Sequence, residues 1–440
     1  MKVYFRTLGC PKNEVDSDIA RQLLQKEGWE IVESPGQADA VVVNTCAFIQ
    51  DAKEESIEAI FSLSRMKEER PVLLAVSGCL GQRYNRELFE EIPEADLVIG
   101  VNDYQDLGKL LDQAARGERL RRSSPCPRQF EECPGMYARV EGGSAYLKIA
   151  EGCNNRCTYC VIPQIRGGYR SRRMEAILDE AVALGQRGAK ELVLIAQDVT
   201  GYGKDLYGSL MLPALLKRLE KVEGVEWIRL MYCYPDKITD QLIEEIRRNS
   251  KVCPYVDMPV QHASQTVLKA MNRAGGREVI LSAIQRLRER VPDIALRTTV
   301  ITGFPGEDRE QFEILRDFVE EIRFDRLGVF AYSKEENTPA AQMKPQVRKD
   351  VKERRRDILM ELQQSISLEK NREKIGSIQQ VFVEEGPDEE GAYYGRTRQD
   401  AREIDNGVIF TAEGRSLSRG DIIKVRIVDA FDYDLAGEAI

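Results

Sequence analysis

The sequence predicts an α/β protein of three parts: a doubly wound parallel-sheet domain, a partial (β/α)6 TIM-like barrel and a small C-terminal all-β barrel. Apolar runs alternate with helix patterns in two separate blocks, and such alternation indicates parallel βαβ units. After about residue 375 the helix patterns stop, and short strand patterns follow one another. The length of 440 residues agrees with about three domains.

The first block, residues 1–116, predicts the doubly wound domain. Its strand patterns are short and apolar, and helical stretches such as Ala52–Lys67 separate them. The predicted strands are Val3–Leu8, Ala40–Asn44, Leu73–Ser77 and Leu97–Gly100. Residues 117–143 break this pattern with several Arg, Ser and Pro residues, and they predict a linker.

The second block, residues 144–374, contains six strand–helix repeats, which is two fewer than a complete eightfold barrel has. We therefore expect an open, partial barrel. A charged, helix-favouring stretch, Val347–Lys374, ends the block and is expected to pack on the barrel. The predicted strands are Ala145–Ala150, Glu191–Gln197, Trp227–Met231, Tyr255–Val260, Ala295–Ile301 and Arg326–Tyr332.

The last segment, residues 375–440, predicts a small closed β-structure. Its strand patterns are separated by Gly and Asp, as is typical of small β-barrels. The predicted strands are Ile378–Val383, Tyr393–Thr397, Val408–Thr411 and Ile422–Val428.

Composition excludes several classes of protein. The formal net charge of −9 argues against a protein that coats nucleic acid through bulk charge. No apolar run approaches the ~20 residues that span a bilayer, and no apolar stretch follows Lys2 and Arg6 as in a secretory signal. We expect a cytoplasmic protein without a membrane partner. In the reducing cytoplasm, the ten cysteines are expected to be metal ligands, catalysts or buried thiols and not disulfide partners. The single histidine, His262, argues against a histidine-rich zinc site.

The strongest local signal is a triad of cysteines with the spacing C-x3-C-x2-C. Cys153, Cys157 and Cys160 follow the first barrel strand, at the end where barrel active sites lie. Three thiolates on one loop can bind three irons of a cubane cluster, and the fourth iron keeps an open position. The alternatives are a three-cysteine zinc site or buried thiols.

A second set of cysteines is dispersed along the first block. Cys10, Cys46 and Cys79 each come at or just after the carboxyl end of a predicted strand. In an open parallel sheet those ends share one crevice, so we expect the three thiols to converge. Gly9 and Gly78 suit a backbone that must turn sharply there. The alternative is three buried structural cysteines.

The first of these triads resembles the radical S-adenosylmethionine enzymes. The resemblance implies that the open iron binds the amino and carboxylate groups of S-adenosyl-L-methionine. Reductive cleavage then yields a radical that abstracts hydrogen from an unactivated carbon. It also implies that Tyr159, just before the third cysteine, lies beside the adenine. Packing under the loop is the alternative role for this tyrosine.

The two triads together resemble the methylthiotransferases, over essentially the whole chain. That family implies a second 4Fe-4S cluster in the N-terminal domain, which carries sulfur, and a C-terminal β-barrel called TRAM that engages the substrate. Several motifs are similar to the ribosomal-protein branch (RimO type). They are Gly9-Cys10-Pro11-Lys12-Asn13, Asp16-Ser17, Asn44-Thr45-Cys46-Ala47-Phe48-Ile49, Ala52-Lys53-Glu54-Glu55-Ser56-Ile57 and Pro259-Val260-Gln261-His262-Ala263-Ser264.

This branch implies methylthiolation of the β-carbon of one aspartate in small-subunit ribosomal protein S twelve. It also implies an electron donor such as flavodoxin or ferredoxin, and a sulfur donor. The alternative is a transfer-RNA methylthiotransferase (MiaB type) that acts on isopentenyladenosine or threonylcarbamoyladenosine. The last 66 residues hold 14 acidic and 7 basic side chains, and an acidic face suits a basic ribosomal protein better than RNA.

The resemblance places further cofactor contacts at barrel strand ends, and we carry these over to Asp198 and Gly303. No catalytic residue is predicted beyond the cluster ligands. A basic stretch after the cysteine loop could meet a carboxylate or could be an exposed helix start. It consists of Arg166, Arg170, Arg172 and Arg173. The remaining cysteines are expected to be non-ligands, namely Cys126, Cys133, Cys233 and Cys253.

Overall fold

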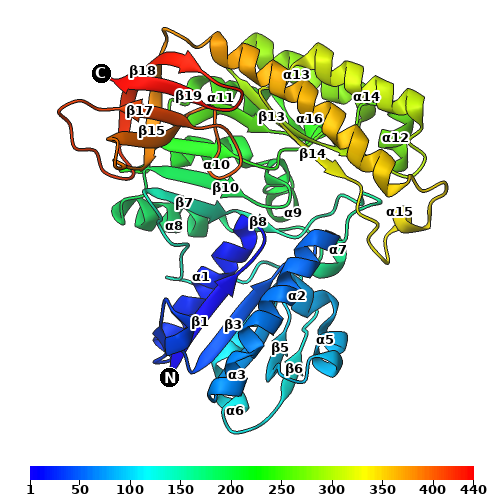
Figure 1. Ribbon diagram of the computed structural model, residues 1–440, viewed down its shortest axis with the longest axis vertical. Coiled ribbons are helices and arrows are strands. Elements are labelled where there is room, and N and C mark those ends of the chain that lie inside the picture. The colour runs from blue at the N-terminus through cyan, green and yellow to red at the C-terminus, as the bar shows by residue number, and fades with distance from the viewer. The chain divides into compact units, whose positions relative to one another are not determined.

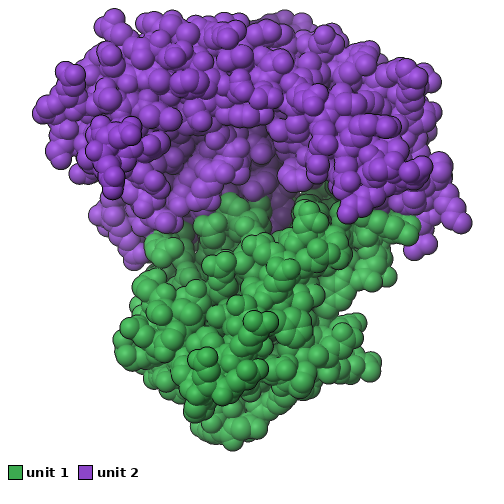
Figure 2. Space-filling model, viewed as in Figure 1, with its two compact units in different colours: residues 1–139, 150–176, 333–341 green, residues 140–149, 177–332, 342–440 purple.

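The fold is described from a computed structural model of residues 1–440. The chain divides into two compact units, which Figure 2 distinguishes by colour. The first unit comprises residues 1–139, 150–176 and 333–341, and the second comprises residues 140–149, 177–332 and 342–440. All six predicted cluster ligands therefore belong to the first unit. No helix in either unit is long and apolar enough to cross a membrane.

The first unit is built on a six-stranded parallel sheet with the strand order β2-β1-β3-β4-β5-β6 (Figure 1). From β1 the chain adds β2 on one side and then β3 to β6 on the other, so the direction of strand addition reverses at β1, as in doubly wound folds. The strands are β1 (Lys2–Thr7), β2 (Glu30–Ile31), β3 (Ala40–Thr45), β4 (Leu73–Ser77), β5 (Leu97–Ile99) and β6 (Leu120–Arg122). The edge strand β6 lies in the stretch predicted to be a linker, because its three residues carry too short a pattern to indicate a strand.

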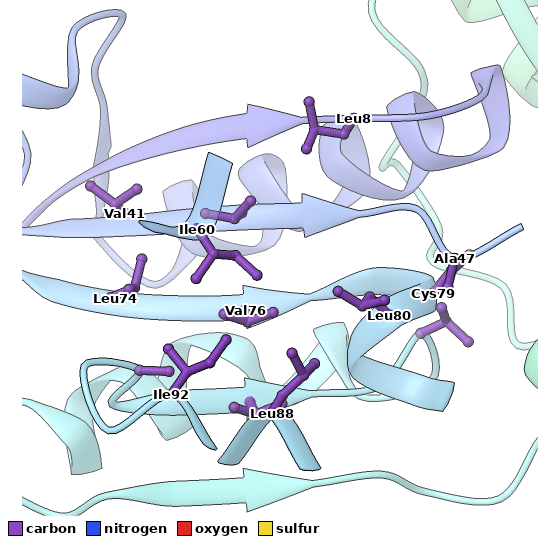
Figure 3. Packing of buried hydrophobic residues seen from close by; sticks show 14 of the residues in the cluster. Leu8, Val41, Ala47, Ile60, Leu74, Val76, Cys79, Leu80, Leu88 and Ile92 are labelled. Atoms are coloured by element: carbon purple, nitrogen blue, oxygen red, sulfur yellow. The ribbon is translucent and has the colours of Figure 1, made fainter. Parts of the chain in front are cut away.

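Helices cover both faces of this sheet. One apolar cluster joins Ile60, Leu80 and Leu88 to one face, and another joins Leu24 and Leu111 to the opposite face. Figure 3 shows part of the first cluster along β3 and β4. The helices are α1 (Pro11–Lys26), η1 (Pro35–Gln37), α2 (Gln50–Ser64), α3 (Met66–Glu69), α4 (Gly78–Arg83), α5 (Asn85–Glu91), η2 (Tyr104–Asp106) and α6 (Leu107–Ala114). The predicted doubly wound architecture is confirmed.

Two later segments complete the first unit. Residues 150–176 contain the antiparallel pair β8 (Ala150–Glu151) and β9 (Arg170–Ser171), with α7 (Ile162–Ile165) between them. Residues 333–341, which we call the strap, lead into α15 (Pro339–Gln342).

The second unit contains a six-stranded parallel sheet with the order β14-β13-β12-β11-β10-β7. Sequential strands are neighbours, and the sheet does not close, so the predicted partial barrel is confirmed. The strands are β7 (Ser144–Lys148), β10 (Glu191–Ile195), β11 (Trp227–Leu230), β12 (Val252–Asp257), β13 (Ala295–Thr302) and β14 (Arg326–Ala331).

The helices of this barrel agree with the helix patterns between its strands. The predicted helix that ends the block is present as α16 (Lys349–Arg372), which buries Leu359 and Ile366. It contacts β14, as expected. The other helices are α8 (Met174–Gln186), η3 (Val199–Gly201), α9 (Lys204–Tyr207), α10 (Leu212–Leu219), η4 (Pro235–Lys237), α11 (Asp240–Arg248), α12 (Gln265–Ala270), α13 (Gly276–Arg290) and α14 (Arg309–Ile322).

The chain ends in a closed β-barrel with the order β15-β16-β17-β19-β18. Its strands are β15 (Ile378–Glu385), β16 (Ala392–Thr397), β17 (Val408–Thr411), β18 (Ile422–Ala430) and β19 (Leu435–Ala439). The strand patterns in the sequence did not reveal β19, because four of its five residues are Ala, Gly or Glu, which carry little strand signal. This strand closes the barrel by pairing in parallel with β17 and antiparallel with β18.

A buried ionic layer joins the two barrels of the second unit. Arg396 of the small barrel pairs with Glu191, which also accepts a hydrogen bond from Arg229 at 2.9 Å. Arg326 donates to Asp400 at 2.5–2.8 Å. These charges are removed from water, so leaving any of them unpaired would be energetically costly. The layer therefore favours this orientation of the small barrel on the larger one.

Candidate functional site

Cys10, Cys46 and Cys79 lie together at the carboxyl ends of β1, β3 and β4. Figure 3 shows Cys79 beyond the tips of the neighbouring arrows. Gly9 has a φ of +93°, and a Cβ placed there would lie 2.8 Å from Cβ and 3.1 Å from Sγ of Cys46. Gly78 also has a positive φ, and its Cβ would meet Thr45. Both glycines are needed because neighbouring loops approach too closely for a side chain.

The side chain of Asn13 connects the loops that carry these three cysteines. Its Nδ2 donates to the carbonyl of Leu8 at 2.8 Å and to that of Thr45 at 3.0 Å, just before Cys46. Its Oδ1 accepts from Sγ of Cys79 at 3.8 Å. Asn13 is fully buried, so each of these bonds replaces lost contact with water.

The donor set of this triad, three cysteine sulfurs, is the type that iron–sulfur clusters use, while burial favours the neutral thiol form of two of them. Burial raises the pKa of the Cys46 thiol to about 12, and the nearby thiol of Cys79 adds to the rise. Burial also raises the pKa of Cys79. Such thiols become ligands when a metal replaces their protons. No three or more His, Cys, Asp or Glu side chains are arranged as the ligands of a single metal ion would be.

Arg166 brings a buried positive charge to this triad. Its Nη2 donates to Oδ1 of Asn13 at 2.6 Å and lies 3.4 Å from Sγ of Cys79. Its Nη1 donates to Asp16 at 2.6 Å and to Glu151 at 3.3 Å. Burial opposes the charge, but the thiol and the two carboxylates raise the pKa of Arg166 well above its usual value. The guanidinium therefore stays charged.

Cys153, Cys157 and Cys160 lie on the loop between β8 and α7. The backbone N–H of Cys160 donates to the carbonyl of Cys157 at 3.1 Å, which makes the loop tight. The N–H of Ile162 lies 3.4 Å from Sγ of Cys160, and Nδ2 of Asn155 lies 3.5 Å from Sγ of Cys153. N–H groups that point at sulfur stabilise the thiolate form that an iron cluster needs.

The strap holds this loop and the first triad in one unit. Its Glu335 is buried and accepts from Lys53 at 2.9 Å and from Arg83 at 2.7 Å. Arg83 belongs to α4, the helix that contains Cys79. The N–H of Ala340 donates to the carbonyl of Thr158, between the second and third cysteines of the loop. Sequence reasoning did not find the strap, since none of its residues belongs to a local motif.

The remaining predicted site residues have different surroundings. Tyr159 is partly buried within the cysteine loop. Asp198 and Gly303 belong to the second unit. The Asp198 carboxylate caps η3 by accepting from Gly201 and also pairs with Lys237 at 2.8 Å. Its cofactor role therefore remains a prediction, beside a clear capping role.

Gly303 lies at the carboxyl end of β13 with a φ of +69°. A Cβ there would clash with the side chain of Lys352, and the N–H donates to both oxygens of Glu307 at 3.0 Å. Glu307 also lies 3.2 Å from Nε2 of His262, which is fully buried. The positive φ and the close approach of Lys352 explain why position 303 is a glycine. The role of Gly303 in cofactor binding remains a prediction. The contacts of Glu307 also agree with a structural role for His262.

The basic stretch after the cysteine loop is not an exposed helix start. Arg166, Arg170 and Arg172 are buried, and Arg172 pairs with Glu132 at 2.9 Å. Only Arg173 is exposed. The exposed-helix alternative is therefore wrong for three of the four, because the chain there forms β9 and packs inside the first unit.

The other four cysteines have different surroundings. Cys126 accepts from Nδ2 of Asn102, and Cys133 accepts from Nε2 of Gln105. Cys233 and Cys253 are fully buried in the second unit. None of these arrangements resembles the two triads, and the four are retained as predicted non-ligands.

Three family models match the chain in succession. Residues 2–100 match Uncharacterized protein family UPF0004, residues 147–319 match the Radical SAM superfamily, and residues 375–440 match the TRAM domain. The second match includes the C-x3-C-x2-C loop, and the third coincides with the closed C-terminal barrel.

Curated relatives match the whole length. The ribosomal protein uS12 methylthiotransferase RimO of Caldanaerobacter subterraneus is 48% identical over 433 residues, with 98% of each chain covered. The protein of the same name from Lachnoclostridium phytofermentans is 46% identical over 440 residues, with 100% of each chain covered. The chain belongs to the RimO family. Membership confirms the predicted enzyme class, a radical SAM methylthiotransferase.

Solved structures show a shared fold at low identity. The radical S-adenosylmethionine methyltransferase TsrM from Kitasatospora setae, with tryptophan and a SAM analogue bound, has a TM-score of 0.58 at 14% identity. The alignment covers 88% of this chain and 79% of that one. The cobalamin-dependent enzyme OxsB has a TM-score of 0.52 at 14% identity, over 77% and 54% of the two chains. The similarity extends over most of this chain and concerns the fold alone.

The structure thus brings Cys10, Cys46 and Cys79 close to one another, includes the C-x3-C-x2-C loop in the same unit, and adds residues that the sequence did not predict. Asn13 and Asp16 occur in motifs that support the family resemblance, but their contacts depend on loops far apart in sequence. Arg166 was one of four candidate arginines. Its contact with Cys79 distinguishes it from the others.

Proposed function

We propose that this protein methylthiolates the β-carbon of an aspartate in ribosomal protein uS12. The observation that carries the proposal is the convergence of Cys10, Cys46 and Cys79 in the same unit as the C-x3-C-x2-C loop. One such loop is expected of any radical SAM enzyme, whereas a second triad supplies a separate place for sulfur chemistry. The full-length relatives, which are named for action on uS12, support the choice of substrate.

We assign one 4Fe-4S cluster to each triad. Cys153, Cys157 and Cys160 would hold the cluster that binds S-adenosyl-L-methionine, and the first triad would hold the auxiliary cluster. A cluster with an open iron, together with this cofactor, supplies the radical that removes hydrogen from an unactivated carbon. TsrM, which shares the fold, has been solved with a 4Fe-4S cluster bound.

The protein residues contribute positioning and exclusion of water. Asn13 aligns the loops of the first triad, and burial of Cys46 and Cys79 keeps solvent from their sulfur atoms. The N–H groups at Ile162 and Asn155 orient the loop thiolates. We further propose that Tyr159, Asp198 and Gly303 contact S-adenosyl-L-methionine.

The acidic C-terminal barrel is proposed to engage the protein substrate. Its excess of acidic side chains is complementary to a basic ribosomal protein and would repel the phosphates of transfer RNA. We also propose an electron donor of the flavodoxin or ferredoxin type, a separate sulfur donor and a cytoplasmic location. The domain boundaries at residues 116, 143 and 374 remain part of this proposal.

Mass spectrometry of the substrate tests the proposed reaction. Reconstituted enzyme, reductant, sulfide and S-adenosyl-L-methionine are incubated with uS12, and the digested protein is analysed for an aspartate that has gained one methylthio group in place of hydrogen. Transfer RNA treated in parallel is digested to nucleosides. Modified uS12 with unchanged nucleosides supports the proposal. Methylthiolated adenosine with an unchanged peptide would assign the enzyme to transfer RNA.

A further inference from the structure

We propose that the buried pair of Arg166 and Asp16 sets the reduction potential of the cluster held by Cys10, Cys46 and Cys79. This inference rests on the proposed function, because it requires that cluster. Arg166 would act as a positioning residue with an electrostatic effect, through its contact with the thiolate of Cys79. The similarity to relatives does not assign it this role.

The geometry of Arg166 separates its two ends. Its Nη1 edge is held by the carboxylates of Asp16 and Glu151, and its Nη2 edge is directed at Cys79 and Asn13. The guanidinium is planar and rigid, so anchoring one edge fixes the direction of the other. The positive charge therefore lies between the cysteine sulfur and the two carboxylates.

Burial makes this arrangement effective. Arg166 is 3% exposed and Asp16 is 6% exposed, so water screens neither charge strongly. Adding an electron makes a cluster more negative. A positive charge and an N–H donor at a ligand sulfur stabilise that reduced form, and they raise the reduction potential. The carboxylate of Asp16 has the opposite effect, since it offsets part of the charge of Arg166.

The two partners therefore predict shifts of opposite sign. Arg166→Gln removes the charge, so the auxiliary cluster should become harder to reduce. Asp16→Asn leaves Arg166 charged and removes the opposing carboxylate, so the cluster should become easier to reduce. We expect the equilibrium ratio of reduced to oxidised cluster to change at least tenfold in each case, which corresponds to about 59 mV for a one-electron couple.

The measurement is a redox titration followed by EPR on the full-length protein. All variants are made in a background in which Cys153, Cys157 and Cys160 are replaced by Ala, so that only the auxiliary cluster contributes to the spectrum. Arg172→Gln is the matched control, because Arg172 is a buried, ion-paired arginine of the same segment and its pairing is with Glu132.

The outcomes separate this inference from the proposed function. If the background protein holds no cluster, the ligand assignment fails. If it holds a cluster whose potential is the same in Arg166→Gln, Asp16→Asn and Arg172→Gln, the ligand assignment stands and this inference is overturned. If Arg166→Gln does not take up the cluster, the test rests on Asp16→Asn. A reduction potential of the Asp16→Asn cluster that is unchanged or lowered then overturns the inference.

Discussion

Oδ1 of Asn13 lies 3.8 Å from Sγ of Cys79, while Nδ2 of the same amide holds the chain next to Cys46. One buried side chain thus contacts two of the three loops that carry the first triad and also holds the carbonyl of Leu8, two residues before Cys10. The alignment of the three thiols depends on this amide, because the cysteines come from three separate strand ends.

Replacement of Asn13 should therefore remove the auxiliary cluster. We expect Asn13→Ala to lower the free energy of unfolding by about 3 kcal/mol, since buried carbonyls lose their donors. After anaerobic reconstitution, the variant should hold roughly half the iron of the wild type, because one of two clusters is lost. Iron analysis and urea unfolding measure the two effects.

Asn85 provides a matched control for this substitution. It is also buried, and its Nδ2 donates to the carbonyls of Gly81, Val98 and Arg122, which are not ligand residues. Asn85→Ala should be destabilised to a similar extent and should keep its full iron content. Equal iron in both variants would show that Asn13 does not organise the triad.

Gly9 allows a second test of the close approach between loops. Gly9→Ala should displace Cys46, since the new Cβ would lie 2.8 Å from that residue's Cβ. Gly28 has nearly the same φ, +89°, but a Cβ added there would meet no atom within 4 Å. Gly28→Ala should cost only about 1 kcal/mol for the left-handed conformation. We expect loss of iron in Gly9→Ala alone, and equal iron contents would contradict the crowding argument.

The two triads should be separable by substitution of one ligand in each. Cys157→Ala should abolish cleavage of S-adenosyl-L-methionine and leave the auxiliary cluster in place. Cys79→Ala should still release 5′-deoxyadenosine but give no methylthiolated uS12. Chromatography of the nucleoside and mass spectrometry of the peptide distinguish these results. Cys233→Ala, which replaces a buried thiol outside both triads, should retain both activities.

The ionic layer between the two barrels of the second unit should make stability depend on pH. Burial alone would raise the pKa of Glu191, but Arg396 and Arg229 lower it to about 2. The carboxylate therefore stabilises the fold fully above its unfolded pKa, near 4.5, and this contribution is lost as the pH falls toward 2. Its full size is about 3 kcal/mol.

Urea unfolding of wild type and Glu191→Gln between about pH 6 and about pH 3 tests this linkage. The difference in unfolding free energy between the two proteins should be largest at the upper end and should shrink as the medium becomes acidic. A difference that is constant over the range would show that the Glu191 carboxylate is not specifically stabilised in the folded state.

Features that depend on local pattern were predicted well from the sequence. The periods of the apolar residues determine the parallel sheets and α16, and the spacing of Cys153, Cys157 and Cys160 places three thiols on one loop without help from the rest of the chain. The positions of Cys10, Cys46 and Cys79 after strands were also sufficient to predict their convergence, because parallel strands end at one edge of a sheet.

The charged pairs became visible only in the three-dimensional packing of the chain. Arg166 and Asp16 are 150 residues apart, and Arg396 and Glu191 are 205 residues apart, so no local pattern could reveal either pair. Short strands such as β6 and β19 likewise form because a neighbouring strand offers hydrogen-bond partners, and their own residues carry little signal. The sequence determined where the thiols lie, and packing determined the charges and amides that surround them.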